Sequence, residues 1–267
     1  MRLLSEQIEI LKKQGYRQAT AEAKAAHDAI LLAMSRCGLK ASSTVKGGVV
    51  MSHVTNDIRR TTMDMDIAFI HRSISEVSVR RFVTRLNCLP GVKISIFGTV
   101  GELLHDDYRG KRVYLHVNDG SLDAPLMTKL DIGVHTHSEI SQVECCFVLG
   151  DETDKVDLQA NSMEQIFAEK LLSLLKLRAL SKRPKDIFDL YYLREHVRAE
   201  TLKRYLDILV YGNRSCKCNE KAEAVAILRE TFASKSFMRR LSGARVNWLE
   251  IDPQLAVDGI VRFVESL

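Results

Sequence analysis

The sequence lacks any long uninterrupted apolar run. Although 46% of its 267 residues are hydrophobic, no stretch approaches the roughly 18 to 20 apolar residues that a membrane-spanning helix requires. Residues 1–6 (MRLLSE) are too acidic and too broken by polar side chains for a secretory signal. These absences predict a globular cytoplasmic protein without a membrane partner, large enough to bury a sizeable core in one large or two modest domains.

The sequence also lacks the cysteine spacing of a disulfide framework. Its six cysteines include no C-x-x-C pair, and Cys145 and Cys146 stand in an apolar, strand-like run. Cys216 and Cys218 form a single C-x-C without the further ligands that a zinc site needs. We therefore expect reduced thiols and no structural zinc.

Two common nucleotide-binding signatures are missing as well. The chain contains neither G-x-x-x-x-G-K-[ST] nor G-x-G-x-x-G, which disfavours P-loop and dinucleotide-binding folds. It has instead a glycine pair, Gly47-Gly48, that follows Lys46 and precedes a predicted helix. By itself such a pair is most often a tight turn. Lys46 and the helix favour phosphate binding, because glycines let backbone amides approach phosphates and a helix N-terminus attracts anions.

Two aspartates follow this turn on one face of a predicted strand. In residues 63–70 apolar side chains alternate with Asp64 and Asp66, so both carboxylates point to the same side. A second predicted strand, residues 126–135, carries Asp131 opposite a mostly apolar face. Three such carboxylates suit two hard divalent cations such as Mg²⁺, which take oxygen ligands and substrate phosphates. Taken alone, the first pair could also be the solvated face of an edge strand.

The sequence predicts different types of secondary structure in its two halves. Residues 1–155 combine N-terminal helices with strand-like runs and a helix at 75–87, which predicts an α+β sheet domain. Residues 156–267 predict a mostly helical domain, and no repeat or low-complexity linker separates the halves. The predicted strands are 63–70, 92–100, 112–118, 126–135 and 143–149, and the predicted later helices are 162–181, 185–197, 200–211, 219–233 and 254–265.

The helical half carries a lysine within an apolar stripe. On a helix over residues 164–180, Ile166, Phe167 and Leu174 lie within about 60° of Lys170 around the axis. An isolated lysine of this kind is usually a snorkelling side chain that covers apolar surface. Facing a bound nucleotide, it would supply a point charge for the triphosphate.

Two more aspartates follow the lysine helix. Asp186 and Asp189 come just after Pro184 at a predicted helix start, where capping and the helix dipole explain acidic side chains. Their i, i+3 spacing also places both on one face, where they could orient Lys170 or contact ribose or a metal. Arg178, about 80° around the helix from Lys170, could reach a phosphate or pair with a carboxylate.

The order of these motifs resembles the nucleotidyltransferase superfamily, whose pattern is h-Gly-[Gly/Ser] followed by Asp-h-[Asp/Glu]-h, with h apolar. Here Arg60 and Thr62 precede Asp64 and Asp66, as in Arg-x-[Ser/Thr]-x-Asp-h-Asp. Fifteen residues separate Gly48 from Asp64, which is long for the superfamily.

The later motifs narrow the resemblance. Glu169-Lys170-Leu171 with Arg178, and the run RPKDIFDLY at 183–191, are similar to the Glu-Lys and Arg-x-Lys-Asp-x-x-Asp motifs of the AbiEii/AbiGii abortive-infection toxins. Members of that family are the toxins of bacterial toxin–antitoxin pairs. The resemblance covers roughly residues 40–195.

The resemblance implies a fold, a reaction and partners. The fold is a nucleotidyltransferase-like mixed sheet with flanking helices, followed by a helical domain that closes the nucleotide cleft. The reaction is transfer of NMP from an NTP, with two Mg²⁺ ions, to an RNA acceptor, the tRNA 3′ end, with release of pyrophosphate. A cognate antitoxin is the implied protein partner.

The resemblance also implies a role for each motif residue. Metal binding and catalysis fall to Asp64, Asp66 and Asp131, and the last of these is best placed to take the proton of the attacking hydroxyl. Lys170 counts as catalytic and as a triphosphate ligand. The remaining predicted nucleotide-binding residues are Lys46, Gly47, Gly48, Arg60, Thr62, Arg178, Asp186 and Asp189.

Basic residues gather in two regions of the sequence. A charge run is usually a solvated face, but an enzyme acting on RNA needs cations that bind phosphates near its site. No aromatic-rich RNA-recognition signature is present, which favours positioning through phosphates. The larger group is Lys182, Arg183, Lys185, Arg194, Arg198, Lys203 and Arg204, and the smaller is Arg80, Arg81 and Arg85.

Two alternatives to an RNA transferase stay open at this point. The acceptor could be a small molecule such as an aminoglycoside, or a protein side chain; the basic crowding favours RNA over an aminoglycoside. A non-catalytic interaction module built on the same fold is the alternative from another class, and the presence of all three carboxylates argues against it.

Overall fold

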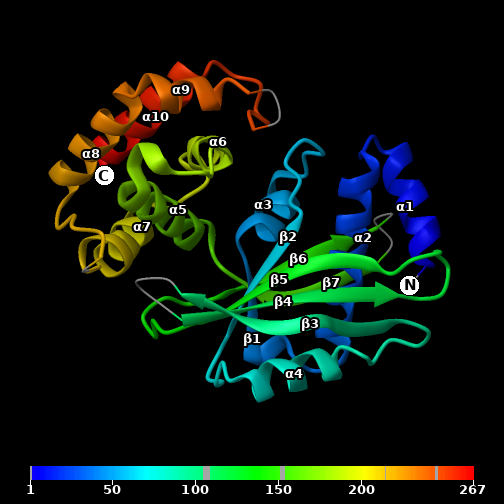
Figure 1. Ribbon diagram of the computed structural model, residues 1–267. Helices are drawn as coiled ribbons and strands as arrows, with labels where there is room; N and C mark the ends of the chain where they lie inside the picture. Colours follow the sequence, from blue (N-terminus) through cyan, green and yellow to red (C-terminus); the bar gives the residue numbers. More distant parts are fainter. Residues whose placement is uncertain (1, 105–108, 151–153, 214, 244–245) are drawn as a thin grey trace. The chain divides into compact units, whose positions relative to one another are not determined.

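The computed structural model describes residues 2–104, 109–150, 154–213, 215–243 and 246–267. It forms two compact units, Met1–Asn161 and Ser162–Leu267 (Figure 1). Residues 151–153, in the region where the sequence places the domain boundary, lie outside the described residues. The first unit holds the sheet and the second is helical.

A seven-stranded mixed sheet forms the centre of the first unit. The strand order is β3-β4-β5-β2-β1-β7-β6. The pairs β2–β5 and β1–β7 are parallel, and the other neighbours are antiparallel. The predicted sheet with flanking helices is confirmed. The strands are β1 (Ser43–Lys46), β2 (Asp64–Phe69), β3 (Lys93–Leu104), β4 (Arg109–Asn118), β5 (Leu126–Val134), β6 (Val143–Leu149) and β7 (Asp154–Ala160).

Two of these strands, β1 and β7, are not predicted from the sequence. Strand β1 has only four residues, and its first three are all buried, so no alternation marks it. Strand β7 does alternate, with Val156, Leu158 and Ala160 buried, but the charged side chains between them conceal a strand that pairs with β1 and β6. Because β7 continues to Ala160, the sheet unit extends to Asn161.

Helices cover one face of the sheet on its β5, β2 and β3 side. Helix α2 packs on β5, and α4 packs on β3. Figure 1 shows α4 running alongside β3. The ring of Phe69 on β2 lies 5.2 Å from that of Phe82 on α4. The helices of this unit are α1 (Leu4–Lys13), α2 (Gln18–Arg36), α3 (Gly47–Thr55) and α4 (Glu76–Arg85), with a 3₁₀ turn at Lys40–Ser42.

The long gap between Gly48 and Asp64 contains helix α3 and a loop. Helix α3 ends at Thr55, and Asn56 closes it in the left-handed conformation with φ of 46°, which Asn tolerates better than most residues. The helix packs against β2. Helix α3 and this loop therefore return the chain from the glycine pair to the start of β2, where Asp64 lies.

His27 fastens helix α2 to the two strands that carry the predicted carboxylates. Its Nε2 lies 3.0 Å from Thr128 Oγ1 on β5, and the ring also hydrogen-bonds the backbone of Met63, just before β2. The side chain is buried, and burial lowers the pKa of His27 to about 4, with nearby Lys24 acting in the same direction. The ring is thus neutral in the folded protein at neutral pH.

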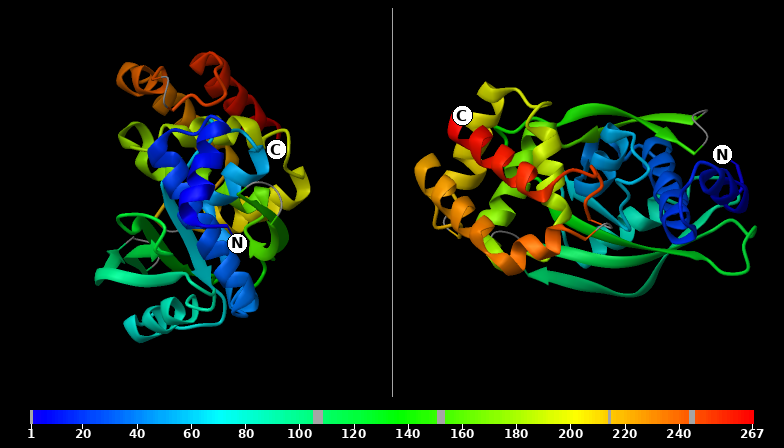
Figure 2. Two further views of the ribbon diagram at one scale, coloured as in Figure 1. Left: turned by 90° about the vertical axis from the view of Figure 1, so that its right-hand side faces the viewer. Right: turned by 90° about the horizontal axis from the view of Figure 1, so that it is seen from above.

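The second unit is a cluster of helices around α5. Helix α5 packs against α6 and α7, and α10 lies beside α6 and α8 (Figure 2). The sequence predicts these helices but misses α9, which Ser234 caps by accepting a hydrogen bond from the Phe237 amide. The helices are α5 (Met163–Leu177), α6 (Lys185–Leu193), α7 (Ala199–Leu206), α8 (Lys221–Ala233), α9 (Lys235–Leu241) and α10 (Pro253–Ser266), with a 3₁₀ turn at Arg178–Leu180 and a π-helical turn at Asp207–Tyr211.

All six cysteines are free thiols. Within the described part of the chain, no helix has the length and apolar content needed to cross a membrane.

We predict that His27→Gln removes part of the acid sensitivity of folding. The unfolded chain binds a proton at this histidine near pH 6.5, whereas the folded protein binds it only near pH 4. The native state therefore loses stability as the pH falls from 6.5 towards 4, by about 2 kcal/mol between pH 7 and pH 5. Glutamine can keep a hydrogen bond to Thr128 but does not titrate, so its unfolding free energy should vary less over this range.

Denaturant unfolding at both pH values measures this difference. His196→Gln is the matched control, because that histidine is exposed, and it should keep the pH dependence of the wild type. An identical pH dependence in His27→Gln and the wild type would contradict the assignment.

Candidate active site

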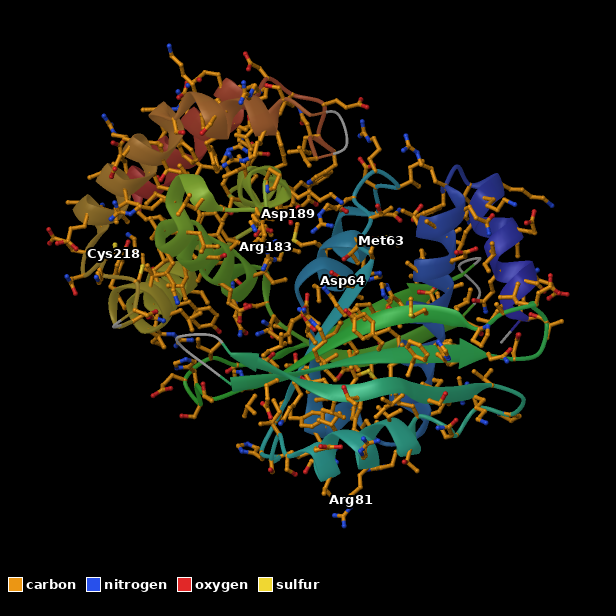
Figure 3. All side chains as sticks on the ribbon, viewed as in Figure 1. Met63, Asp64, Arg81, Arg183, Asp189 and Cys218 are labelled. Atoms are coloured by element: carbon orange, nitrogen blue, oxygen red, sulfur yellow. The ribbon has the colours of Figure 1, made fainter. Side chains whose placement is uncertain are left out.

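The three predicted metal-binding aspartates lie on one face of the sheet, on two adjacent strands. In the parallel pairing of β2 with β5, Asp66 is opposite Asp131 and Asp64 is opposite Lys129. Figure 3 labels Asp64 at the start of β2. The alternate residues of both strands, including Met65 and Leu130, are buried on the other face. The apolar face thus fixes which side the carboxylates occupy.

Two cations on the same face pair with these carboxylates. Lys129 Nζ lies 2.6 Å from Asp64 Oδ2. Arg112, which is opposite Asp131 in the β4–β5 pairing, donates from Nε and Nη2 to the two carboxylate oxygens, each at 2.7 Å. These hydrogen bonds raise the pKa of the Arg112 guanidinium further. Neither cation is predicted from the sequence, because its place beside the aspartates follows from strand order and register.

The glycine pair lies directly against the carboxylate strand. Gly47 has φ of 58°, and a Cβ there would come 2.7 Å from Asp66 Oδ2. A Cβ on Gly48 would come 2.6 Å from Thr62 Oγ1. Lys46, the residue before the pair, is opposite Asp66 in the β1–β2 pairing. The N-terminus of α3, with its unpaired amides, is therefore held beside an aspartate, and only glycine fits at the contact.

Arg60 and Thr62 support this arrangement from the loop before β2. Thr62 donates its hydroxyl hydrogen bond to the Asp64 carbonyl at 3.0 Å. Arg60 is buried, and its Nη1 donates to the Thr61 carbonyl at 3.1 Å. Both side chains thus hold the backbone that leads into Asp64. Both residues are predicted nucleotide ligands, and these contacts favour support of the strand.

The chemistry of the site fits a divalent cation. Carboxylate oxygens are ligands that Mg²⁺ prefers, usually with substrate phosphates completing the shell. Gly47 keeps open a space beside Asp66 that a Cβ would fill. Within the described residues, however, no group of three or more His, Cys, Asp or Glu side chains has the arrangement of a metal site. Arg112 and Lys129 hold Asp131 and Asp64 instead, so the number of ions stays a prediction.

The second unit contains a buried ion network around Lys170. Its ammonium pairs with Asp186 and lies 2.8 Å from Asp189 Oδ2, and all three side chains are buried. Asp189 Oδ1 accepts a hydrogen bond from Trp248 Nε1 at 3.0 Å. Arg183 Nε lies 2.8 Å from Asp186 Oδ2. The i, i+3 aspartates therefore contact Lys170, which is one of the roles that their spacing suggests.

Several of the basic residues pair with carboxylates of their own unit. Arg178, at the end of α5, lies 3.2 Å from Glu230 and is half exposed. Arg194 pairs with Glu195, and Arg198 pairs with Glu164. The pair of Arg178 with Glu230 is exposed on both sides, and exposed pairs are worth little energetically. In the smaller basic group, the side chain of Arg81 extends from α4 away from the sheet (Figure 3).

The fold of the chain resembles solved nucleotidyltransferase structures. A crystal structure from H. pylori, assigned to the nucleotidyltransferases, aligns with a TM-score of 0.53 at 14% identity, covering 91% of this chain and 93% of that one. JHP933 from Helicobacter pylori aligns with a TM-score of 0.44 at 14% identity, over 90% and 94% of the two chains. A nucleotidyltransferase-like antigen from Paracoccidioides brasiliensis gives 0.43 at 17% identity, over 71% and 87%.

The sequence itself defines the family. Residues 29–250 match the model of the nucleotidyl transferase AbiEii toxin family, part of a type IV toxin–antitoxin system. This chain belongs to that family, and it is a nucleotidyltransferase that uses an NTP. The resemblance drawn from the motifs is confirmed. No curated protein matches the chain.

We predict that Gly47→Ala abolishes nucleotide binding, whereas Gly91→Ala does not. Both glycines have positive φ, so both substitutions carry left-handed strain of about 1 to 2 kcal/mol. Only at Gly47 does the new Cβ also collide with Asp66, since Gly91 has nothing within 4 Å. Calorimetric titration with Mg²⁺–NTP should show at least a tenfold loss for Gly47→Ala and none for Gly91→Ala. Equal affinities in the two variants would exclude a contact between the glycine turn and the site.

We predict that Lys170→Met destabilises the helical unit by about 3 kcal/mol, because it removes the ammonium that pairs with two buried carboxylates, of which Asp186 keeps its ion pair with Arg183. Trp248 is the only tryptophan of the chain and donates to Asp189, so its fluorescence reports the network directly. Denaturant unfolding followed at this tryptophan measures the change. Lys203→Met, at an exposed position of α7, should stay within about 0.5 kcal/mol of wild type; a similarly small effect at Lys170 would contradict the ion network.

Proposed function

We propose that this protein is a Mg²⁺-dependent toxin that transfers NMP from an NTP to the 3′ end of an RNA, with tRNA as the acceptor. The observation that carries the proposal is the pairing of β2 with β5 beside the glycine turn, which brings Asp64, Asp66 and Asp131 to one face next to the start of α3. This combination supplies carboxylates for a cation and amides for a phosphate. Family membership supports the reaction class.

In the proposed reaction, the acceptor hydroxyl attacks the α-phosphorus in line with the leaving pyrophosphate. A new oxygen–phosphorus bond forms as the bond to the β-phosphate oxygen breaks, and the hydroxyl proton passes to the Asp131 carboxylate. Gly47 and Gly48 hold phosphate oxygens with their amides. Asp64 and Asp66 would hold Mg²⁺, which when bound neutralises phosphate charge and lowers the pKa of the attacking hydroxyl.

The ion pairs of the site shape how this reaction can begin. Arg112 holds both oxygens of Asp131, and Lys129 holds Oδ2 of Asp64. Each cation therefore makes its carboxylate a weaker base and a weaker metal ligand while the pair lasts. Phosphates of the incoming nucleotide are the natural competitors, because both cations prefer a more highly charged partner. We propose that NTP binding opens both pairs, so that the site becomes active only with its substrate.

The buried network of the helical unit has a separate role in the proposal. Lys170 has three N–H donors, of which Asp186 and Asp189 take two. On the family resemblance we propose that Lys170 is a triphosphate ligand, and that the two aspartates orient its ammonium. Arg178 is retained as a nucleotide ligand on the family resemblance alone, since its contact in the structure is with Glu230.

The partners follow from the family and the chemistry. A toxin of this family has a cognate antitoxin as its expected protein partner. NTP and tRNA occur together in the cytoplasm, so the proposed reaction belongs there.

Transfer of label from each of four α-³²P-NTPs to total tRNA tests the proposal. Wild-type protein with Mg²⁺ should label tRNA from one or a few nucleotides, and Asp66→Asn should reduce this at least a hundredfold, because it removes a cation ligand but keeps the shape. Thermal unfolding checks that the variant is folded. NTP binding without any labelled tRNA would refute the acceptor, and small-molecule or protein acceptors would then be tested. Absence of NTP binding would refute the catalytic function.

A further inference from the structure

The sheet face that carries the carboxylates continues across β5, β4 and β3 as an exposed surface with large apolar side chains. Phe97 on β3, Tyr114 on β4 and Met127 on β5 are exposed by 54%, 42% and 59%. The opposite face of the same strands is buried, with Ile94 and Leu115 at 1% and 0%. The exposed rings are thus a property of this face, which helices α2 and α4 leave uncovered.

Strand register places these rings in line with the carboxylates. Phe97 is opposite Tyr114, Tyr114 is opposite Lys129, and Lys129 is opposite Asp64. These residues form one row across four adjacent strands. With strands about 4.8 Å apart, Tyr114 lies about 10 Å and Phe97 about 14 Å from Asp64 along the row. The row therefore leads from the edge of the sheet to the catalytic residues.

The rings offer flat surfaces of the kind on which bases stack. Phe97 stacks on His116 with ring centroids 4.5 Å apart and an interplanar angle of 23°. His116 is also on β4, two residues from Tyr114, and so shares its face. Aromatic side chains on an open sheet are a recurrent means of binding single-stranded RNA, because every base has a π-face.

The charge of this face suits a polyanion. Lys93, Arg112 and Lys129 alternate with the rings on the three strands. Arg112 and Lys129 pair with Asp131 and Asp64, and phosphates of a bound strand can compete for both cations. Among the described side chains on this face of β3, β4 and β5, Asp131 is the only acid. Cations interleaved with stacking rings are the combination that binds a nucleic acid strand without reading its sequence.

We propose that the face formed by Phe97, Tyr114, His116, Met127 and Lys93 is a platform on which the unpaired bases before the acceptor 3′ end stack. This inference rests on the proposed function, since it assumes an RNA acceptor, and it specifies that the acceptor end is single-stranded. The terminal nucleotide lies at the carboxylates, and preceding bases follow the row towards Phe97. A protein partner covering the same face is the alternative, and it explains less well why the row ends at Asp64.

Phe97→Ala and Tyr114→Ala test the platform. The probe is a 5′-fluorescent, 12-nucleotide single-stranded RNA, and its binding is measured by anisotropy. Each substitution should weaken binding about tenfold, the double variant should weaken it further, and Tyr114→Phe should bind like the wild type, because it keeps the ring. Val77→Ala, an exposed apolar position on α4, is the matched control and should leave binding unchanged.

Two further readouts separate this inference from the proposed function. Calorimetric binding of Mg²⁺–NTP should be unchanged in the platform variants, and this also shows that they are folded. In the transfer assay, KM for RNA should rise with little change in kcat. If the wild type binds the RNA and the alanine variants bind it equally well, the platform is wrong, whatever the result of the RNA-labelling assay.

Failure of the proposed function has a different signature. If no NTP transfers label to any RNA, yet the alanine variants still lose RNA binding, the platform stands and the acceptor reaction fails. If the wild type does not bind the oligonucleotide at all, the platform is wrong, and the face is then a surface for a protein partner.

Discussion

The pairing of β2 with β5 is the constraint on which the candidate active site depends. It places Asp66 beside Asp131 and Asp64 beside Lys129, and the pairing of β4 with β5 adds Arg112 to the same face. A slip of one residue would turn every one of these side chains into the core. Burial of Met65, Leu130 and their neighbours therefore does more than stabilise the sheet, because it selects the single register in which the charged groups meet.

The glycine turn and the histidine behind the sheet fix this arrangement from opposite sides. Gly47 and Gly48 allow the start of α3 to approach Asp66 and Thr62 more closely than any side chain would permit. On the other face, His27 joins α2 to Thr128 on β5 and to the backbone before β2. The site is thus positioned largely by residues to which the proposed mechanism gives no chemical step.

Much of the fold and the acidic part of the site can be predicted from the sequence, because a period of two identifies which residues share a strand face. Asp64 and Asp66 share one face of the first predicted strand, and Asp131 lies on the polar face of a second one. Their neighbours Arg112 and Lys129 could not be assigned, because pairing partners depend on strand order, which periodicity does not contain. The same reason hides the aromatic face: Phe97 and Tyr114 are seventeen residues apart in the sequence and adjacent only across strands.

The distribution of charge suggests that the carboxylates of the site are occupied by cations of the protein until a nucleotide binds. Asp64 pairs with Lys129, and Asp131 pairs with Arg112. In each pair a cation occupies a carboxylate to which the proposed mechanism gives a role, at moderate cost because the pairs are partly exposed and screened. Phosphate-rich ligands can take these cations, since doubly charged oxygen groups compete well with a single carboxylate. Binding of the nucleotide and readiness of the carboxylates are then the same event, which links activity to occupancy without a separate conformational switch.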